Sequence, residues 1–192
     1  MADYEYTSMS NNKERVRSIK QAAIFFDVAT LPTSTDWKPG ENEKPLGYLS
    51  EDGITLHPEA GDSDEIKGHN GDTIYNEATG GNWTLQLSAV ESSKTAAALY
   101  FGVTPGDDGT ITLDDATVKG THTVVLAGLD QKGKPIIVVG YQATVSDRDD
   151  ITFKAGELVQ FNITLSLAKA AGGHMLSIFG AFDPETEPKK EL

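Results

Sequence analysis

The sequence has no cysteine, few basic residues and no long apolar run. None of its 192 residues is Cys, which excludes disulfide frameworks, thiolate catalysis and zinc sites built on cysteine. Its 16 Lys and Arg are outnumbered by 29 Asp and Glu, giving a formal net charge of −13. This charge argues against a protein that holds nucleic acid through its phosphates, because such binding needs basic side chains to displace counterions.

No stretch approaches the roughly 20 apolar residues that a membrane helix needs. Near the N-terminus, Asp3 and Glu5 stand where a signal peptide would carry basic and apolar residues, so we expect a protein that is not secreted by this route. The lack of cysteine suits a reducing cytoplasm. A chain of this length fits one domain that buries about 70% of its unfolded surface.

Motifs for catalysis or cofactor binding are also missing. The four histidines have no pair at the spacing of a metal site, and neither acidic run continues into a calcium-binding loop. The sequence contains no glycine-rich phosphate loop and no nucleophile elbow. We therefore expect neither an enzyme nor a bound metal or cofactor. The residues considered are His57, His69, His122 and His174, with the acidic runs 62–65 and 147–150.

The clearest structural signals lie between residues 46 and 102. Residues 46–56 combine apolar positions with the turn sequence Glu51-Asp52-Gly53, which predicts a hairpin. Residues 66–74 are polar and punctuated by glycine, and residues 83–89 alternate apolar and polar positions, as in a half-buried strand. Residues 92–102 carry Ser at the start, helix formers inside and Gly102 at the end, which predicts one short helix.

The second half of the chain has the pattern of long strands. Residues 123–127 and 136–146 flank the turn-rich 130–134 and predict a hairpin. In residues 159–167 every second position is apolar, and a last strand is predicted at 175–179. The whole predicts a mainly β fold: an antiparallel β-sandwich or barrel with one short helix.

We divide the chain into an N-terminal arm (1–18), a β domain (19–182) and a C-terminal tail (183–192), both ends expected to be flexible. The arm is either solvated or docked on an acidic neighbour, because it concentrates basic residues. Residues 30–45 form a long loop rich in proline, with Trp37 among polar residues. That indole is either tucked onto its own domain or available to a partner.

Three features resemble the major tail tube proteins of long-tailed, non-contractile (siphovirus-type) bacteriophages. They are the run 47–54, the triplet Gly71-Asp72-Thr73, and the strand followed by a small-residue helix that ends in an aromatic residue and Gly102. The resemblance spans roughly residues 19–182. It implies a structural virion protein whose subunits join edge to edge into rings, which are usually hexameric. The strands of all subunits in a ring together close an inner β-barrel.

In that family the rings stack into a tube through which the genome leaves the virion. The resemblance therefore implies a protein of the virion tail, made and assembled in the host bacterial cytoplasm. Its partners would be further copies of itself, the tape measure protein and the tail terminator. DNA would pass without tight binding, and no membrane would be entered.

Two sets of residues are candidate sites. Short polar side chains on the faces of the long strands are expected to face the channel or a neighbouring subunit, and the long loop is expected to contact the next ring. The first set is Gln142, Thr144, Ser146, Gln160, Asn162, Thr164 and Ser166; the second is Trp37, Lys38, Glu41, Glu43 and Lys44.

Two alternatives remain at this point. A non-enzymatic β-sandwich that binds carbohydrate, or acts on a virion surface, would share the strands and loops and would use Trp37 or Trp83 as an aromatic platform. A tube protein of a contractile injection system would share the fold and differ in the sheath around it.

Overall fold

The structure is a computed structural model that describes residues 15–78 and 80–182. Within these residues the only helix has eight residues, and none has the length and apolar character needed to cross a membrane. The elements are β1 (Ile19–Phe26), β2 (Leu49–Glu59), β3 (Ser63–Lys67), β4 (Thr73–Ala78), β5 (Asn82–Ala89), α1 (Lys94–Phe101), β6 (His122–Asp130), β7 (Pro135–Arg148), β8 (Phe161–Ala168) and β9 (Leu176–Phe179).

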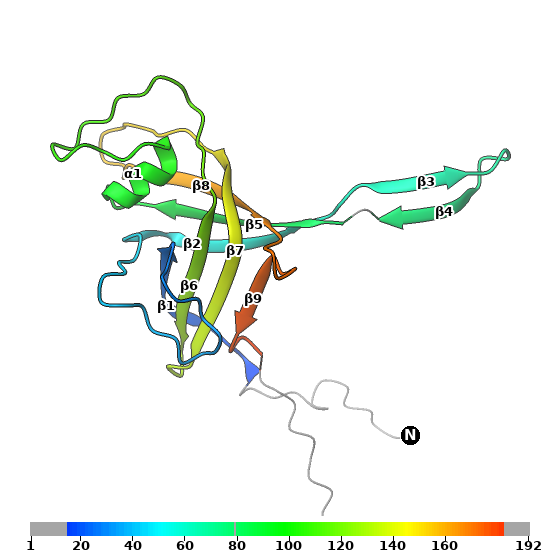
Figure 1. Ribbon diagram of the computed structural model, residues 1–192, viewed down its shortest axis with the longest axis horizontal. Helices are drawn as coiled ribbons and strands as arrows, with labels where there is room; N and C mark the ends of the chain where they lie inside the picture. Colours follow the sequence, from blue (N-terminus) through cyan, green and yellow to red (C-terminus); the bar gives the residue numbers. More distant parts are fainter. Residues whose placement is uncertain (1–14, 79, 183–192) are drawn as a thin grey trace, which may run out of the picture.

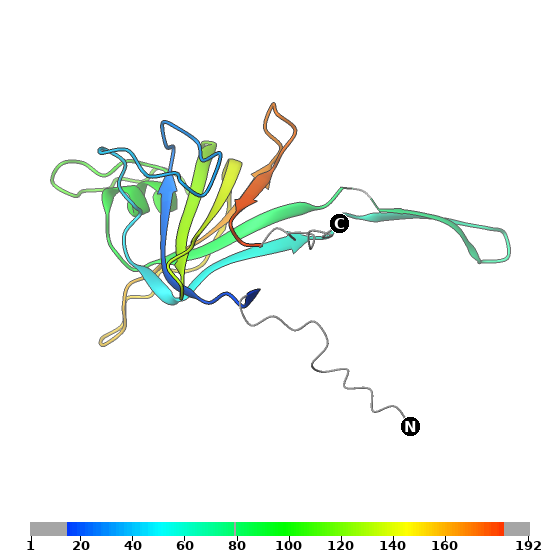
Figure 2. The same ribbon diagram turned by 90° about the horizontal axis from the view of Figure 1, so that it is seen from below.

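One antiparallel sheet forms the body, in the order β1-β6-β7-β8-β5-β2 (Figure 1). The 14-residue β7 is long enough to pair with β9 along its first half and with β8 along its second. The sheet is rolled, so that its two end strands, β1 and β2, line opposite sides of one hollow (Figure 2). The predicted mainly β, antiparallel fold with one short helix is confirmed.

The main core lies between β8, β5 and α1. Phe161, Ile163, Leu165 and Leu167 alternate along β8 and are all buried, as their period-two pattern predicted. The helix begins where Ser93 Oγ accepts a hydrogen bond from Ala96 N. It ends at Gly102, whose φ of 73° is the left-handed conformation that glycine adopts without a side-chain clash.

A second apolar cluster lies on the opposite face of β1, β6 and β7. Neighbouring residues on one strand point to opposite faces, and Ile24 belongs to the main core whereas Phe25 belongs to the second cluster. The loop after β1 covers this cluster with Trp37, whose ring meets that of Phe25 edge to face at 5.6 Å. Trp37 Nε1 also donates to Thr30 O at 2.8 Å. The indole is therefore tucked onto its own domain.

The prediction of a hairpin within residues 46–56 is wrong. Residues on both sides of Glu51-Asp52-Gly53 belong to one strand, β2, and pair with the same partner, β5: Leu49 with Ala89 and Ile54 with Leu87. The extra residues form a bulge, and Gly53 takes the positive φ of 74° there. Turn-type residues fit such a bulge as well as they fit a hairpin turn.

A hairpin forms instead further along the chain, between β3 and β4, and the sequence patterns did not predict it. It extends far from the rolled sheet (Figure 1), and β3 and β4 pair with each other and with no other strand of the described residues. The polar, glycine-punctuated segment 66–74 contains its turn, closed by hydrogen bonds from Gly68 N to Asp72 O and from Gly71 N to Gly68 O.

Residues 15–18 of the predicted N-terminal arm lie against the β6–β7 turn. Arg17 Nη1 donates to the buried Asp130 Oδ2 at 2.5 Å, and Gln131 exchanges hydrogen bonds with the backbone of Val16 and Ser18. The arm's last residues are thus docked on an acidic group of their own domain. Residues 1–14 and the predicted tail 183–192 lie outside the described residues, so their flexibility stays a prediction.

Candidate functional site

A polar surface covers the face of the sheet opposite α1. Asn162, Thr164 and Ser166 on β8 alternate with the buried apolar residues and therefore point away from the core. Directly opposite on β5 stand Ser88, Gln86 and Thr84, respectively. Because opposed residues of an antiparallel pair share a face, these six residues lie on one face of the sheet, which we call the polar face; Thr84 is buried within it.

Strand β7 extends the polar face on the other side of β8. Thr144 lies opposite Ser166 and Gln142 opposite Ala168, so both share a face with the polar residues of β8. A register shift after Val145 then places Asp147, rather than Ser146, opposite Thr164. Ser146 Oγ donates to the Thr164 backbone carbonyl at 3.2 Å. The bulge thus adds a carboxylate that the sequence pattern did not place on this face.

Several polar side chains on this face bond to one another. Ser88 Oγ donates to Asn162 Oδ1, and Asn82 Nδ2 donates to Ser166 Oγ, both at 2.5 Å. Side chains held in this way present a fixed polar wall rather than freely rotating groups. Thr84 differs, because its Oγ1 is buried and has no hydrogen-bond partner within the described chain.

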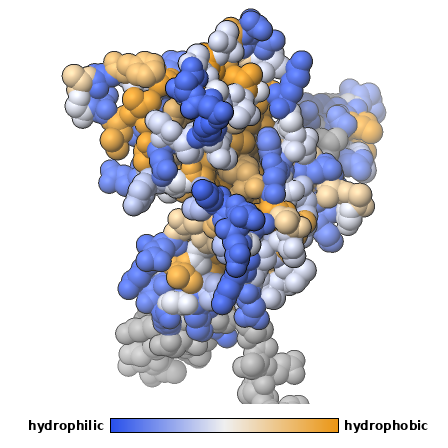
Figure 3. Space-filling view, turned by 60° about the vertical axis from the view of Figure 1, so that its left-hand side comes forward, coloured by the Kyte–Doolittle hydropathy of each residue, from blue (hydrophilic) through white to orange (hydrophobic). Residues whose placement is uncertain are grey.

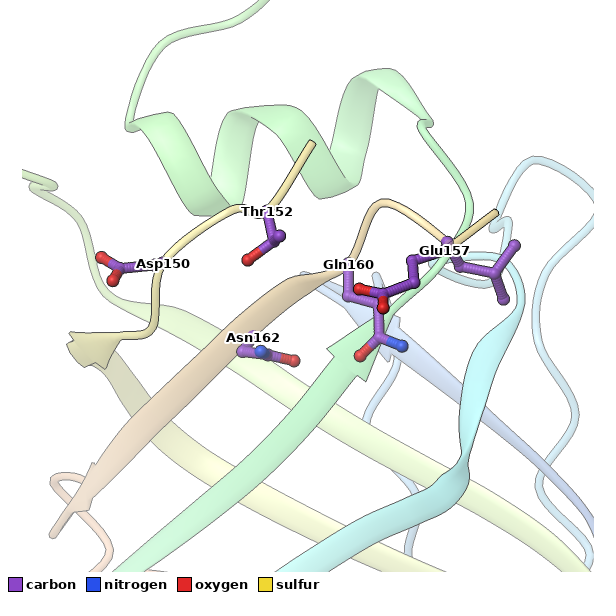
Figure 4. Close-up of a pocket in the computed structure, with 6 residues that line it drawn as sticks. Asp150, Thr152, Glu157, Gln160 and Asn162 are labelled. Atoms are coloured by element: carbon purple, nitrogen blue, oxygen red, sulfur yellow. The ribbon is translucent and has the colours of Figure 1, made fainter. Parts of the chain in front are cut away.

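Two shallow hollows lie at the end of the polar face. One, of about 400 Å³, lies between β8 and the loop that precedes it, with Gln160 and Glu157 close together at one end, Asp150 at the other and Asn162 between (Figure 4). The second, of about 240 Å³, is lined by Asp52, Asp147 and Asp149 beside the polar residues. No Lys or Arg is among the residues that line either hollow, so this end of the polar face is negatively charged.

The structure therefore brings six of the seven predicted strand positions onto or beside one face, and it places Gln160 just before β8 in the larger hollow. The prediction omitted Thr84, Gln86 and Ser88. Their alternation with Trp83, Leu85 and Leu87 was visible in the sequence, but their adjacency to β8 depends on the pairing order. Whether the face lines a channel or a subunit contact stays a prediction.

The five predicted loop positions divide into two groups. Trp37 and Glu43 make contacts within the subunit. The Glu43 carboxylate accepts hydrogen bonds from Ala29 N at 2.6 Å and from Gly40 N at 2.7 Å, and so holds the two ends of the loop segment together. Lys38, Glu41 and Lys44 are exposed. Asp36 of the same loop is exposed as well. Contact of Lys38, Glu41 and Lys44 with another ring stays a prediction.

The residues described hold no group of three or more His, Asp or Glu that could bind a metal ion. Asp27 and His122 do meet, with Oδ2 2.7 Å from Nδ1. The same carboxylate accepts from Thr123 N at 3.0 Å, so it ties the end of β1 to the start of β6. This pair has a structural explanation and needs no catalytic one.

The perturbed ionisable groups also lie away from the polar face. Burial raises the pKa of Tyr100, despite the opposing charge of Arg148. Burial also raises the pKa of Asp130, but hydrogen bonds from Arg17 and from the amides of Lys134 and Lys132 outweigh it and hold the pKa at about 2. The backbone amide of Thr110 lowers the pKa of Asp108.

Comparison with known proteins gives structural similarity only. No family model and no curated protein matches the sequence. One similar solved structure is the anti-feeding prophage cap, described as a tube terminating cap, with 13% identity, a TM-score of 0.42, and coverage of 90% of this chain and 97% of that one.

A sheath-tube complex of the extracellular contractile injection system PVC gives 11% identity, a TM-score of 0.40, and coverage of 84% and 90%, respectively. The anti-feeding prophage baseplate gives 12% identity, a TM-score of 0.42, and coverage of 84% and 93%. Similarity at this level assigns no function to this chain.

Proposed function

We propose that the protein is a structural subunit that assembles with copies of itself into stacked rings, which form the tube of a long, non-contractile phage tail. The observation that carries this proposal is the β3–β4 hairpin. It leaves the body of the subunit with Ile66, Ile74 and Tyr75 exposed by 59%, 72% and 50%. A two-stranded hairpin alone is marginally stable in water, so such an arm gains stability from a neighbouring chain.

The rolled sheet supports the same proposal. It is open, and its end strands β1 and β2 do not pair with each other within the described chain. Unpaired strand edges are templates for pairing with another chain. Subunits joined through such edges would pool their strands into a closed barrel, and the resemblance supplies the expectation of six copies per ring.

The polar face has the chemistry of a channel wall. Duplex DNA carries one negative charge per about 1.7 Å of its axis, and the hollows beside the face are lined by acidic residues and no basic ones. Repulsion would act over about 8 Å at physiological salt, so DNA would slide past without sticking. We therefore assign the polar face to the lumen, where it serves genome delivery passively and without catalysis.

The remaining parts of the proposal come from the resemblance alone. The protein would lie in the virion tail after assembly in the bacterial cytoplasm. The tape measure protein and the tail terminator would be its partners besides its own copies. A tube inside a contractile sheath would use the same subunit surfaces, and inspection of native particles for a sheath distinguishes the two forms.

The two tryptophans that a carbohydrate-binding site would use both pack within the subunit. Trp37 packs on Phe25 and donates its N–H to Thr30 O, and Trp83 packs against the main core. Both indoles are partly buried against the subunit's own apolar clusters. No observation on the described residues favours this function over self-assembly.

Electron microscopy of the purified protein across a concentration series tests the proposal. We expect rings and short stacks with an open channel, with each ring contact burying more than about 2,000 Å². Light scattering on the same samples should show growing mass. A protein that stays monomeric into the millimolar range would contradict the proposal.

A further inference from the structure

A groove beside α1 combines an apolar floor with a basic rim. Its floor is formed by Phe26 of β1, Ala98 and Leu99 of α1, and Val103 and Val118 of the following segments. Lys94 and Lys119 stand among the residues that line it. The hollow measures about 370 Å³, which is within the range of ligand sites. Figure 3 shows apolar atoms exposed among hydrophilic ones on the side of the molecule that carries α1.

Two acidic groups lie near this groove, and each has a partner in the subunit. Asp27, which also lines it, is held by His122 and by Thr123 N. Lys94 Nζ lies 3.0 Å from Asp107 Oδ1, but the two side chains are 55% and 107% exposed. An exposed pair of this kind is weak and can exchange its partner. The groove therefore suits a ligand that combines apolar side chains with acidic ones.

One face of the β3–β4 hairpin has this pattern. Ile66 stands opposite Tyr75, and two residues further along the same face Asp64 stands opposite Glu77. All four side chains are exposed, and Tyr75 Oη donates to Glu77 Oε2 at 2.9 Å. The face is an apolar pair followed by two carboxylates.

The hairpin cannot reach the groove of its own chain. Figure 1 shows α1 at one end of the molecule and β3–β4 extending from the other. Contact between these two surfaces would therefore join two copies head to tail. A head-to-tail contact is heterologous, and it generates rings or open stacks rather than a closed dimer.

We propose that the α1 groove is the docking site for the β3–β4 hairpin of a second copy, with Ile66 and Tyr75 on its apolar floor and Asp64 and Glu77 facing Lys94 and Lys119. The proposal rests on the proposed function and specifies one contact of the assembly. Charge complementarity favours this groove over another exposed apolar feature, the loop with Phe153 and Leu158. That loop carries Asp149, Asp150 and Glu157 against the single Lys154, which pairs with Glu157, so it would repel the acidic hairpin.

Cysteine cross-linking tests the contact directly, because the native chain has no cysteine. One batch of protein carries Ile66→Cys and a second carries Val103→Cys; the two are mixed, assembled and oxidised. The matched control mixes Ile66→Cys with Leu129→Cys, since Val103 and Leu129 are both 39% exposed. We expect disulfide-linked dimers with Val103→Cys at least about tenfold more abundant than with Leu129→Cys.

The outcomes separate the docking contact from tube formation. Assemblies without the cross-link to Val103→Cys would overturn the docking site and leave the tube intact. A specific cross-link without rings or stacks would support the docking site and overturn the tube. Absence of both assemblies and cross-link would overturn both.

A charge exchange gives an independent measurement. Lys119→Glu would put a negative charge in the groove against the acidic hairpin, and Glu77→Lys would put a positive charge on the hairpin against the basic groove. Each change should therefore raise the concentration needed for assembly by about tenfold. Combined in one chain, the two changes should return that concentration to within about threefold of the wild-type value. Lys134→Glu, on the exposed β6–β7 turn, is the control. Additive losses in the double variant would overturn the contact.

Discussion

Arg148 joins the end of β7 to α1 and to the segment that follows the helix. Its guanidinium donates to Tyr100 O at 2.6 Å and to Ala116 O at 2.5 Å, and it lies 5.6 Å from the centre of the Tyr100 ring. A planar fork is needed to reach two carbonyls and a ring at once. The single side chain thus fixes the helix that forms one wall of the groove.

We expect Arg148→Lys to lower the free energy of unfolding by about 2 kcal/mol, because hydrogen bonds to a charged donor are lost. Urea denaturation measures the change. Lys154→Gln is the control, since the Lys154–Glu157 pair is exposed and its loss should cost less than about 0.5 kcal/mol. Equal stabilities of the two variants would show that Arg148 does not hold the helix.

Asp130 predicts a pH dependence whose sign can be worked out. Its pKa is about 2 in the folded protein and about 3.9 in an unfolded chain. A lowered pKa stabilises the fold above the unfolded value, and this stabilisation is lost as the pH falls from about 4 towards 2. Asp130→Asn should therefore be less stable than wild type at pH 7, with the difference shrinking across that window. A difference that is constant from pH 7 to pH 2 would contradict the account.

Thr84 predicts a stabilising substitution. Its hydroxyl is buried, and no partner for Oγ1 is present in the described chain, so the fold bears the cost of desolvating it. Thr84→Val keeps the shape and removes the polar atom, and should raise the free energy of unfolding by up to about 1 kcal/mol. Thr164→Val on the half-buried part of the same face serves as the comparison. A clear loss of stability for Thr84→Val would indicate a hydrogen bond that the geometry does not show.

Among the elements, the β3–β4 hairpin is separable from the body. Glu59 pairs with Asn82 at the base of the arm, so residues 60–81 can be replaced by Asn-Gly, which closes a two-residue hairpin turn. We expect circular dichroism and thermal unfolding to show a folded β domain, and electron microscopy to show no rings or stacks. Normal assembly without the arm would remove the hairpin from the mechanism.

The elements that could be predicted from the sequence are those with a buried face or a cap. Strand β8 alternates cleanly because one side is buried, and α1 has Ser93 and Gly102 at its two ends. The β3–β4 hairpin gave no such signal, since the residues of β3 are all exposed and no core imposes a period. Glu51-Asp52-Gly53 has the composition of a turn, and only the pairing of β2 with β5 reveals that it forms a bulge.

The candidate site was predictable to a similar extent. Alternation identified which side chains of β7 and β8 turn away from the core. It could not show that β5 lies beside β8, because strand order is set by tertiary pairing. It also could not place Asp147 on the polar face, since the bulge at Ser146 changes the phase of the strand.

At the scale of the whole molecule, charge and shape constrain assembly together. Each copy carries a formal charge of −13, so copies repel one another unless their contacts are locally complementary. The α1 groove supplies local basic groups for the acidic hairpin, and added salt screens the rest. The assembly would thus combine attraction at defined contacts with a surface that repels DNA.

Asn162→Lys tests whether the polar face lines the channel. Asn162 is half-buried, accepts a hydrogen bond from Ser88 and lies beside both acidic hollows. In a water-filled lumen the change should cost little beyond that bond, about 1 kcal/mol, and tubes should form. Each ring would then add positive charges facing the channel, and these tubes should retain duplex DNA at low salt and release it as salt rises.

Asn42→Lys, on the exposed loop after β1, is the matched control and should leave DNA retention unchanged. If Asn162 instead lies between subunits, the same lysine would be buried without a partner at a cost of several kcal/mol, and tubes would not form. Tubes of Asn162→Lys that assemble normally and retain no more DNA than those of Asn42→Lys would exclude both placements. In that case the polar face would be an outer surface, and another face of the rolled sheet would have to line the channel.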